Sequence, residues 1–117
     1  MIFYDIPKTI DKELDQFESD IHDFVSGKIN PTKFKAIRVA HGVYEQRQEN
    51  TYMIRIRCAA GGITPKQLKK VAELGELYGN GEVHFTTRQE VQVHNVVVKD
   101  VMTVIRELLT VGLSSRG

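Results

Sequence analysis

The sequence predicts an α+β fold, in which an antiparallel sheet carries two helices on one face and a further helix precedes this unit. Two observations predict it. Apolar and polar side chains alternate, as in strands with one buried face, along residues 51–58, 83–86 and 91–94. Apolar side chains recur at helical spacing along residues 11–25, 64–79 and 100–112.

The N-terminal helix is expected from about Asp11 to Val25, with Gly27 as its C-terminal stop. Its apolar stripe consists of Leu14, Phe17, Ile21, Phe24 and Val25. Residues 28–31 are expected to form a loop, because proline disfavours helix in the residue before it. The segment Thr32–Val39 stays open between a connection and a short edge element.

A hairpin is expected next, with strands at 42–47 and 51–58 around the turn-like residues 48–50. In its second strand, one face consists of Tyr52, Ile54, Ile56 and Cys58, and the other of Met53, Arg55 and Arg57. Residues 59–62 end the alternation.

Thr64, Pro65 and Gln67 form a helix start with a capping box. This helix is expected to bury Leu68, Val71, Ala72, Leu74 and Leu77, and to end at Gly79. A second helix is expected from near Asp100 to Gly112, with Val101, Val104, Ile105, Leu108 and Leu109 on its apolar side.

From Thr51 onward the order is strand, helix, strand, strand, helix, which is most of a ferredoxin-like split βαβ unit. The tail Leu113–Gly117 offers a run of small residues instead of a closing strand. We therefore divide the chain into residues 1–33, an N-terminal helix and linker, and residues 34–117, a ferredoxin-like half-domain.

The composition limits the classes of function that this chain can have. The 117 residues suit one domain, and a formal net charge of only +1 disfavours a general nucleic-acid binder. The single cysteine, Cys58, excludes an internal disulfide and a self-contained iron–sulfur cluster. The sequence shows neither a secretory signal nor a membrane segment, so we expect a cytoplasmic protein without a membrane partner.

The face of the sheet opposite the helices is expected to be polar. By strand parity it collects Arg55, Arg57, His84, Thr86, Gln92 and His94, with Arg88 at the strand end and no carboxylate. Arginine donates in bidentate fashion to carboxylates and oxyanions, so this face is suited to an anion. A plain wet sheet face remains the alternative. His84 and His94 lack a third ligand for a metal.

An ordered set of short motifs resembles the siroheme-dependent sulfite and nitrite reductases, over roughly Phe34 to Leu113. The set comprises residues 42–46, 52–57, 61–62, 67–68, 78–79, 86–89, 92 and 111–113. In that family, complete enzymes combine two such half-domains with domains that hold siroheme coupled to a 4Fe-4S cluster.

The resemblance implies roles for individual residues. Arg55 matches the first arginine of the family's Arg-x-Arg strand, and would bind sulfite or nitrite as the catalytic residue of this chain. Thr86, Arg88 and Gln92 match a Thr-x-Arg-x-x-x-Gln pattern that contacts the carboxylate-rich siroheme periphery. On the same face lie two weaker candidates, Arg57 and His94. The electron donor, and the choice between sulfite and nitrite, are not implied.

Two departures from the family pattern are visible. Ala59-Ala60 stands where the family often has a proline, and His84 where it often has arginine. The family's cluster cysteines would lie beyond Gly117, and residues 114–117 resemble the sequence that leads into the next domain. We therefore expect a fragment or a stand-alone relic of a longer reductase, which works with that enzyme's remaining domains, holds no cofactor by itself and is inactive alone.

Two other kinds of function are alternatives to a reductase domain. An RNA-binding sheet needs exposed aromatic side chains. The polar face is expected to offer Met53 but no aromatic residue, because Tyr52 and Phe85 fall on the covered side. The other alternative is a stand-alone ferredoxin-like binding or interaction module without catalysis. Such a module would use the sheet edge left by the missing strand, through which a homodimer could form.

Overall fold

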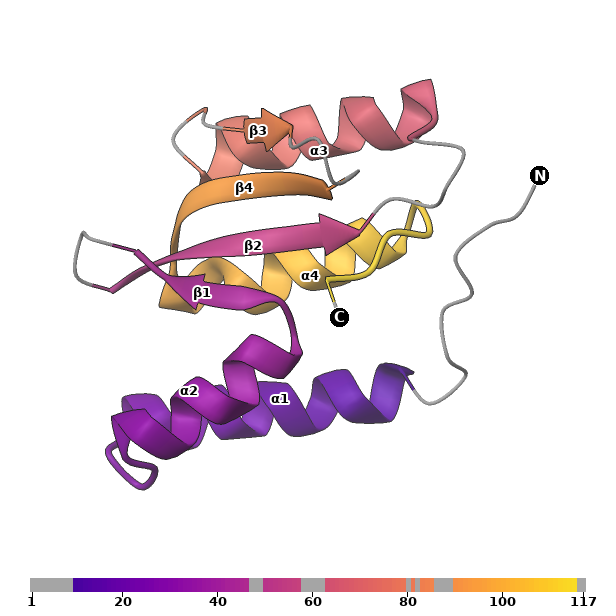
Figure 1. Ribbon diagram of the computed structural model, residues 1–117. Helices are drawn as coiled ribbons and strands as arrows, with labels where there is room; N and C mark the ends of the chain where they lie inside the picture. Colours follow the sequence, from indigo (N-terminus) through magenta and orange to yellow (C-terminus); the bar gives the residue numbers. More distant parts are fainter. Residues whose placement is uncertain are drawn as a thin grey trace.

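The computed structural model describes residues 10–46, 50–57, 63–79, 81, 83–85 and 90–115. Its elements, in order, are α1 (Ile10–Val25), α2 (Pro31–Ala40), β1 (Val43–Glu45), β2 (Thr51–Arg57), α3 (Pro65–Tyr78), β3 (Val83–Phe85), β4 (Glu90–Val97), the 3-10 turn η1 (Val98–Asp100) and α4 (Val101–Leu109). The strands form one antiparallel sheet in the order β1-β2-β4-β3 (Figure 1). The expected α+β, ferredoxin-like architecture is confirmed.

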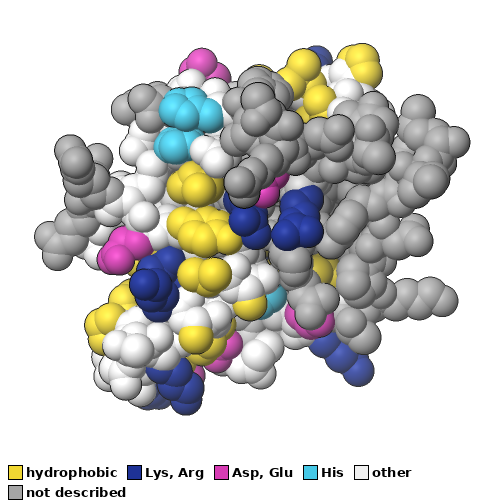
Figure 2. Space-filling model, in the orientation of Figure 1, with side chains coloured by type: hydrophobic (Ala, Val, Ile, Leu, Met, Phe, Trp, Pro, Cys, Tyr) yellow, Lys and Arg dark blue, Asp and Glu magenta, His cyan; other side chains and the backbone are white. Residues whose placement is uncertain are grey.

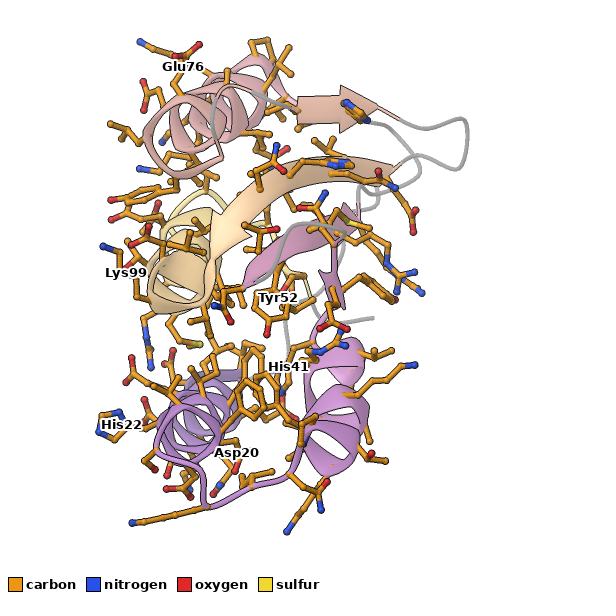
Figure 3. The ribbon with its side chains drawn as sticks, turned by 90° about the vertical axis from the view of Figure 1, so that its left-hand side faces the viewer. Asp20, His22, His41, Tyr52, Glu76 and Lys99 are labelled. Carbon is orange, nitrogen blue, oxygen red and sulfur yellow. The ribbon has the colours of Figure 1, made fainter. Side chains whose placement is uncertain are left out.

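One face of the sheet, which we call the covered face, packs against helices. Helices α3, α4 and α1 lie side by side along it, and α1 extends this layer beyond the β1 edge (Figures 1 and 3). The strands contribute Val43, Tyr52, Ile54, Ile56, Val91, Val93 and Val96 to the core. Burying a side chain of this size stabilises the fold by about 1.5–3 kcal/mol.

A bulge interrupts the alternation of β4. The pairing register with β2 shifts between Tyr52 and Ile54, and Asn95 adopts a left-handed φ of 63°. Because of the extra residue, Val93 and Val96 are three apart in sequence yet both fully buried. Simple parity therefore predicts the faces of β4 only as far as His94.

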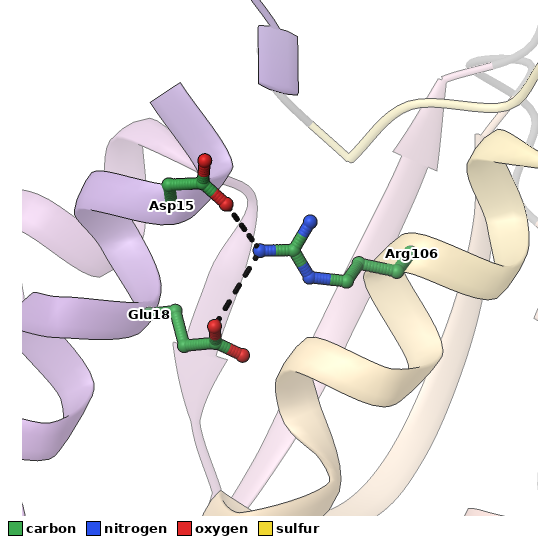
Figure 4. A network of polar contacts seen from close by, with 3 residues as sticks. All are labelled: Asp15, Glu18 and Arg106. Carbon is green, nitrogen blue, oxygen red and sulfur yellow. Dashed lines mark hydrogen bonds and ion pairs between the residues drawn. The ribbon is translucent and has the colours of Figure 1, made fainter. Parts of the chain in front are cut away.

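Helix α1 has the expected apolar stripe, since Leu14, Phe17 and Ile21 are buried. Val25 is an exception: it is exposed at the last turn, so its assignment to the stripe was wrong. The helix is tied to α4 by Arg106, whose Nη2 lies 2.9 Å from Asp15 Oδ1 and 3.6 Å from Glu18 Oε1 (Figure 4). Exposed ion pairs of this kind contribute little stability, at most about 1 kcal/mol.

The segment left open at 32–39 is helix α2. Asn30 is its N-cap, accepting a 2.8 Å hydrogen bond from the Lys33 amide, and Pro31 is its first residue. The proline was read as part of a loop, but after Asn it is a helix-start signal. The boundary proposed between residues 33 and 34 falls inside this helix.

Buried polar side chains join α2 to the sheet. Arg38 is buried and donates a 3.0 Å hydrogen bond to the Val43 carbonyl, with its guanidinium 5.6 Å from the centre of the Tyr52 ring. His41 stacks on Phe17 with ring centres 4.2 Å apart. Figure 3 shows His41 and Tyr52 in the interior between the sheet and the N-terminal helices.

Helix α3 starts with the predicted capping box, in which Thr64 and Gln67 exchange hydrogen bonds of 3.0 and 3.1 Å. Its buried side is narrower than expected and consists of Val71, Leu74 and Gly75. Leu68, Ala72 and Leu77 are exposed, so their assignment to the core was wrong. The reason is position, because α3 lies beside β4 and the edge strand β3, and its contact with them is confined to the side that carries Val71, Leu74 and Gly75.

The C-terminal segment after α4 returns to the sheet. Ser114 makes an isolated antiparallel bridge with Arg57, on the edge of β2 that β1 occupies further along. Leu113, Ser114 and Ser115 are buried. As far as it is described, to Ser115, the tail forms one isolated bridge, and it covers part of the edge that an interaction module was expected to use. No helix in the described part of the chain combines the length and apolar content required to cross a membrane.

Candidate anion-binding face

The other side of the sheet, the open face, turns away from the helices. Among described residues its side chains come from Tyr44, Met53, Arg55, Arg57, His84, Glu90, Gln92 and His94. Strand pairing sets their neighbours: Gln92 of β4 lies between Arg55 of β2 and His84 of β3. Figure 2 shows this side, where histidine and Lys or Arg side chains border a strip of hydrophobic atoms.

Arg55 is held by two neighbours. Its Nε lies 3.3 Å from Glu90 Oε2, with both side chains largely covered, and its guanidinium lies 5.1 Å from the centre of the Tyr44 ring. The distance to Glu90 is that of an ion pair, but the Nε–H is not directed at the carboxylate. Among described residues this buried Nε–H makes no hydrogen bond, so its contact with Glu90 is that of an ion pair only.

Glu90 corrects one expectation, because the open face was predicted to have no carboxylate. It lies two residues before Gln92 on β4, and therefore shares its parity. The error arose because β4 was taken to begin at Val91, whereas it begins at Glu90. The described part of the face thus carries Arg55, Arg57 and one glutamate.

Tyr44 corrects a second expectation. It pairs with Met53 across β1 and β2 and so belongs to the open face, which was predicted to lack aromatic side chains. Strand β1 could have revealed it, since Tyr44 alternates with the buried Val43. The argument against RNA that rested on this absence was wrong. The Arg55 guanidinium lies over one side of the ring, where a base would stack.

Gln92 and His94 belong to a hydrogen-bonded chain. His94 Nε2 lies 3.0 Å from Gln92 Oε1, and His94 Nδ1 lies 2.9 Å from Nε2 of Gln46, the residue after β1. Gln46 Oε1 in turn accepts a 2.6 Å hydrogen bond from the Asn95 amide. The ring of His84 lies 4.2 Å from that of His94. Gln46 was not among the predicted site residues, and only the fold brings it to them.

The remaining predicted residues divide into two groups. Arg57 lies on the open face, opposite Glu90 in the pairing, and is exposed. Thr86 and Arg88 lie outside the described residues, as does Cys58. Within the described part of the chain, no three His, Cys, Asp or Glu side chains come together as metal ligands.

Comparison with known proteins gives a consistent result. Residues 44–111 match the profile of the nitrite/sulfite reductase ferredoxin-like half domain. The assimilatory ferredoxin-dependent nitrite reductase of Haloferax mediterranei is 37% identical over 88 residues, covering 65% of this chain and 15% of that protein. The NADPH sulfite reductase hemoprotein beta-component 2 of Klebsiella pneumoniae is 33% identical over 117 residues, covering 86% of this chain and 20% of that protein.

Among solved structures, the NirA protein of Mycobacterium tuberculosis superposes with a TM-score of 0.74 over 89% of this chain. The sequence identity is 22%, so this likeness concerns the fold alone. The chain corresponds to only 15%, 20% and 23% of the three proteins. It therefore matches one small part of each larger protein.

Proposed function

The chain belongs to the nitrite/sulfite reductase ferredoxin-like half-domain family, and from this premise we propose that its open face contributes substrate-anion and siroheme contacts to a cytoplasmic sulfite or nitrite reductase. One observation carries the proposal. The buried Nε–H of Arg55 makes no hydrogen bond among described residues, although it belongs to a permanent cation. Such a donor favours an anionic partner.

The described residues fit a cofactor rich in carboxylates. Arg55, Arg57 and the Gln92 amide present donors on one side of the sheet, and Glu90 is the one carboxylate among the described residues of that side. Siroheme coupled to a 4Fe-4S cluster would supply the electrons for reduction when bound. In this proposal Thr86, Arg88 and His94 contact the siroheme periphery together with Gln92.

The chain's own groups bind and orient the anion. The Arg55 guanidinium is already positioned by the Tyr44 ring, so little side-chain entropy is lost when a ligand binds. Fixed positive donors stabilise negative charge on a bound oxyanion without reorganisation during the reaction. Arg57 adds positive potential at the exposed end of the same strand.

We also propose that residues 1–117 act only together with the other domains of a longer reductase. The support is that the chain covers about a fifth of the relatives it matches, and that it has one cysteine. A 4Fe-4S cluster needs several thiolates, so its ligands would come from elsewhere. Measurable reduction of sulfite or nitrite by the purified 117-residue chain, supplied with siroheme and a chemical reductant, contradicts this part.

The site itself is tested in the reductase polypeptide that contains this chain. We expect Arg55→Gln to retain siroheme, as measured by its absorption spectrum, while kcat/KM for the anion falls about a hundredfold. Arg88→Ala should instead lower siroheme occupancy. Arg106→Gln removes the same charge from α4, away from the open face, and should change neither quantity. Unchanged kcat/KM in Arg55→Gln would remove Arg55 from the site.

A further inference from the structure

The amide of Gln46 has one orientation that satisfies its neighbours. Its Oε1 lies 2.6 Å from the backbone N of Asn95, and a backbone N–H can only donate. The oxygen must therefore face Asn95, which leaves Nε2 directed at His94. The bulge at Asn95 makes this contact available, because the extra residue leaves the regular hydrogen-bonding pattern of the strand.

The orientation of Gln46 determines where His94 carries its proton. The Gln46 NH2 group donates across 2.9 Å to His94 Nδ1, so Nδ1 must be unprotonated. The proton of the neutral ring is then on Nε2, which donates across 3.0 Å to Gln92 Oε1. Two further groups surround this chain: Arg55 lies opposite Gln92 on β2, and the ring of His84 on β3 lies 4.2 Å from that of His94.

Gln92 is the last member of the hydrogen-bonded chain that begins at Gln46. Its Oε1 is occupied by His94, so the NH2 group is the part of this amide that remains for a ligand. We propose that Gln46 is a positioning residue: by fixing His94 as the Nε2–H tautomer, it makes Gln92 present hydrogen-bond donors to the anionic ligand of the open face. This inference rests on the proposed function for the identity of the ligand, but the hydrogen-bonded chain itself does not.

The other tautomer of His94 would have the opposite effect on the orientation of Gln92. If the proton were on Nδ1, Nε2 would accept a hydrogen bond from the Gln92 NH2 group, and Gln92 Oε1 would turn toward the ligand. An acceptor would then face an anion beside Arg55. Of the two tautomers, Gln46 favours the one with its proton on Nε2, and its removal takes that preference away. If they became equally populated, apparent affinity for the anion would fall about twofold.

Nitrogen NMR of the imidazole rings in the 117-residue chain tests the proposal directly. We expect His94 at neutral pH to be a single tautomer with its proton on Nε2. In Gln46→Leu this signature should be replaced by a mixture of tautomers. In Gln46→Glu the carboxylate should instead draw a proton to Nδ1, giving a ring that is protonated on both nitrogens. Gln16→Leu, on the exposed side of α1, is the matched control and should leave His94 unchanged.

Each outcome bears on the proposal. A wild-type proton on Nδ1, or a pure Nε2–H tautomer that persists in Gln46→Leu with a native amide spectrum, overturns it. If Gln46→Leu does not fold, the isosteric Gln46→Glu decides, and an unprotonated Nδ1 in that variant also overturns it. The proposed function is judged separately by Gln92→Leu in the complete reductase, where unchanged siroheme occupancy and unchanged KM count against the function but leave the tautomer result intact.

Discussion

The two faces of this sheet consist of side chains from the same strands, but different properties of those side chains matter on each face. On the covered face, residues such as Ile54 and Val93 are completely buried, and their shape and volume matter most. On the open face, Arg55 and Gln92 are partly exposed, and each is defined by a polar neighbour. The contrast teaches that the core stabilises the domain whereas the open face carries its specificity. Substitutions should therefore separate stability from binding.

The largest effect is expected for Ile54→Ala on β2. The side chain is fully buried, and truncations of this kind cost about 2–5 kcal/mol. The matched change is its neighbour Met53→Ala, which points to the open face and should cost less than about 1 kcal/mol. Urea unfolding of both variants measures the difference. Equal losses would show that the two faces are not energetically distinct.

Gly42→Ala tests how the tail closes the edge of the sheet. Gly42 has a φ of +74°, and an added Cβ would meet the carbonyl oxygen of Ser115. The left-handed backbone alone costs about 1–2 kcal/mol, and displacement of the tail adds to this. Gly27→Ala is the control, since Gly27 has a φ of +85° but nothing within 4 Å of the new atom. The prediction fails if both variants lose the same free energy of unfolding.

Glu90→Gln tests what the carboxylate beside Arg55 contributes to stability and to anion binding on the open face. The exchange keeps the shape and removes the charge beside Arg55, so the free energy of unfolding should change by less than about 1 kcal/mol. In the complete reductase the freed guanidinium should lower the KM for the anion severalfold. Steady-state kinetics at constant ionic strength measure this. A raised KM would mean that Glu90 chiefly orients Arg55.

Tyr52→Phe tests a titratable group at the covered face. Burial raises the pKa of the Tyr52 phenol, and Glu45 adds to this while Arg38 opposes it. The folded chain then holds a proton that the unfolded chain releases near pH 10. Stability should accordingly fall as the pH rises above about 10, with a slope of at most about 1.4 kcal/mol per pH unit from this group.

In Tyr52→Phe that part of the slope should disappear. Urea unfolding of the two proteins between pH 9 and 11 gives the comparison, and Tyr44→Phe on the open face is the control. Identical pH dependence in the wild type and in Tyr52→Phe would show that the phenol does not contribute.

Much of the fold could be predicted from local patterns. The alternation in β2, the capping box at Thr64 and the stripe of α4 each involve residues close in sequence, and all three are confirmed. The errors lie where position in the fold overrides the pattern. Leu68 and Leu77 have helical spacing but lie outside the narrow contact of α3 with β4 and β3, so they remain exposed.

In the candidate site, too, some features could be predicted from local sequence and others depend on the fold. Parity alone placed Arg55, Arg57, Gln92 and His94 on one face, because side chains alternate in any strand whatever it pairs with. The partners of these residues depend on pairing across the sheet. Glu90 beside Arg55, and Gln46 beside His94 at a distance of 48 residues in sequence, are brought together by the hairpin and the bulge.

The sequence by itself thus determined the order of the elements and, along β2 and along β4 from Val91 to His94, which side chains face the helices and which face outward. Tertiary structure alone decided how the outward side chains pair, because hydrogen bonds and ion pairs depend on distances of a few ångströms between residues far apart in the chain. It also decided that the tail returns to β2, where the absence of a side chain at Gly42 leaves room for the Ser115 backbone.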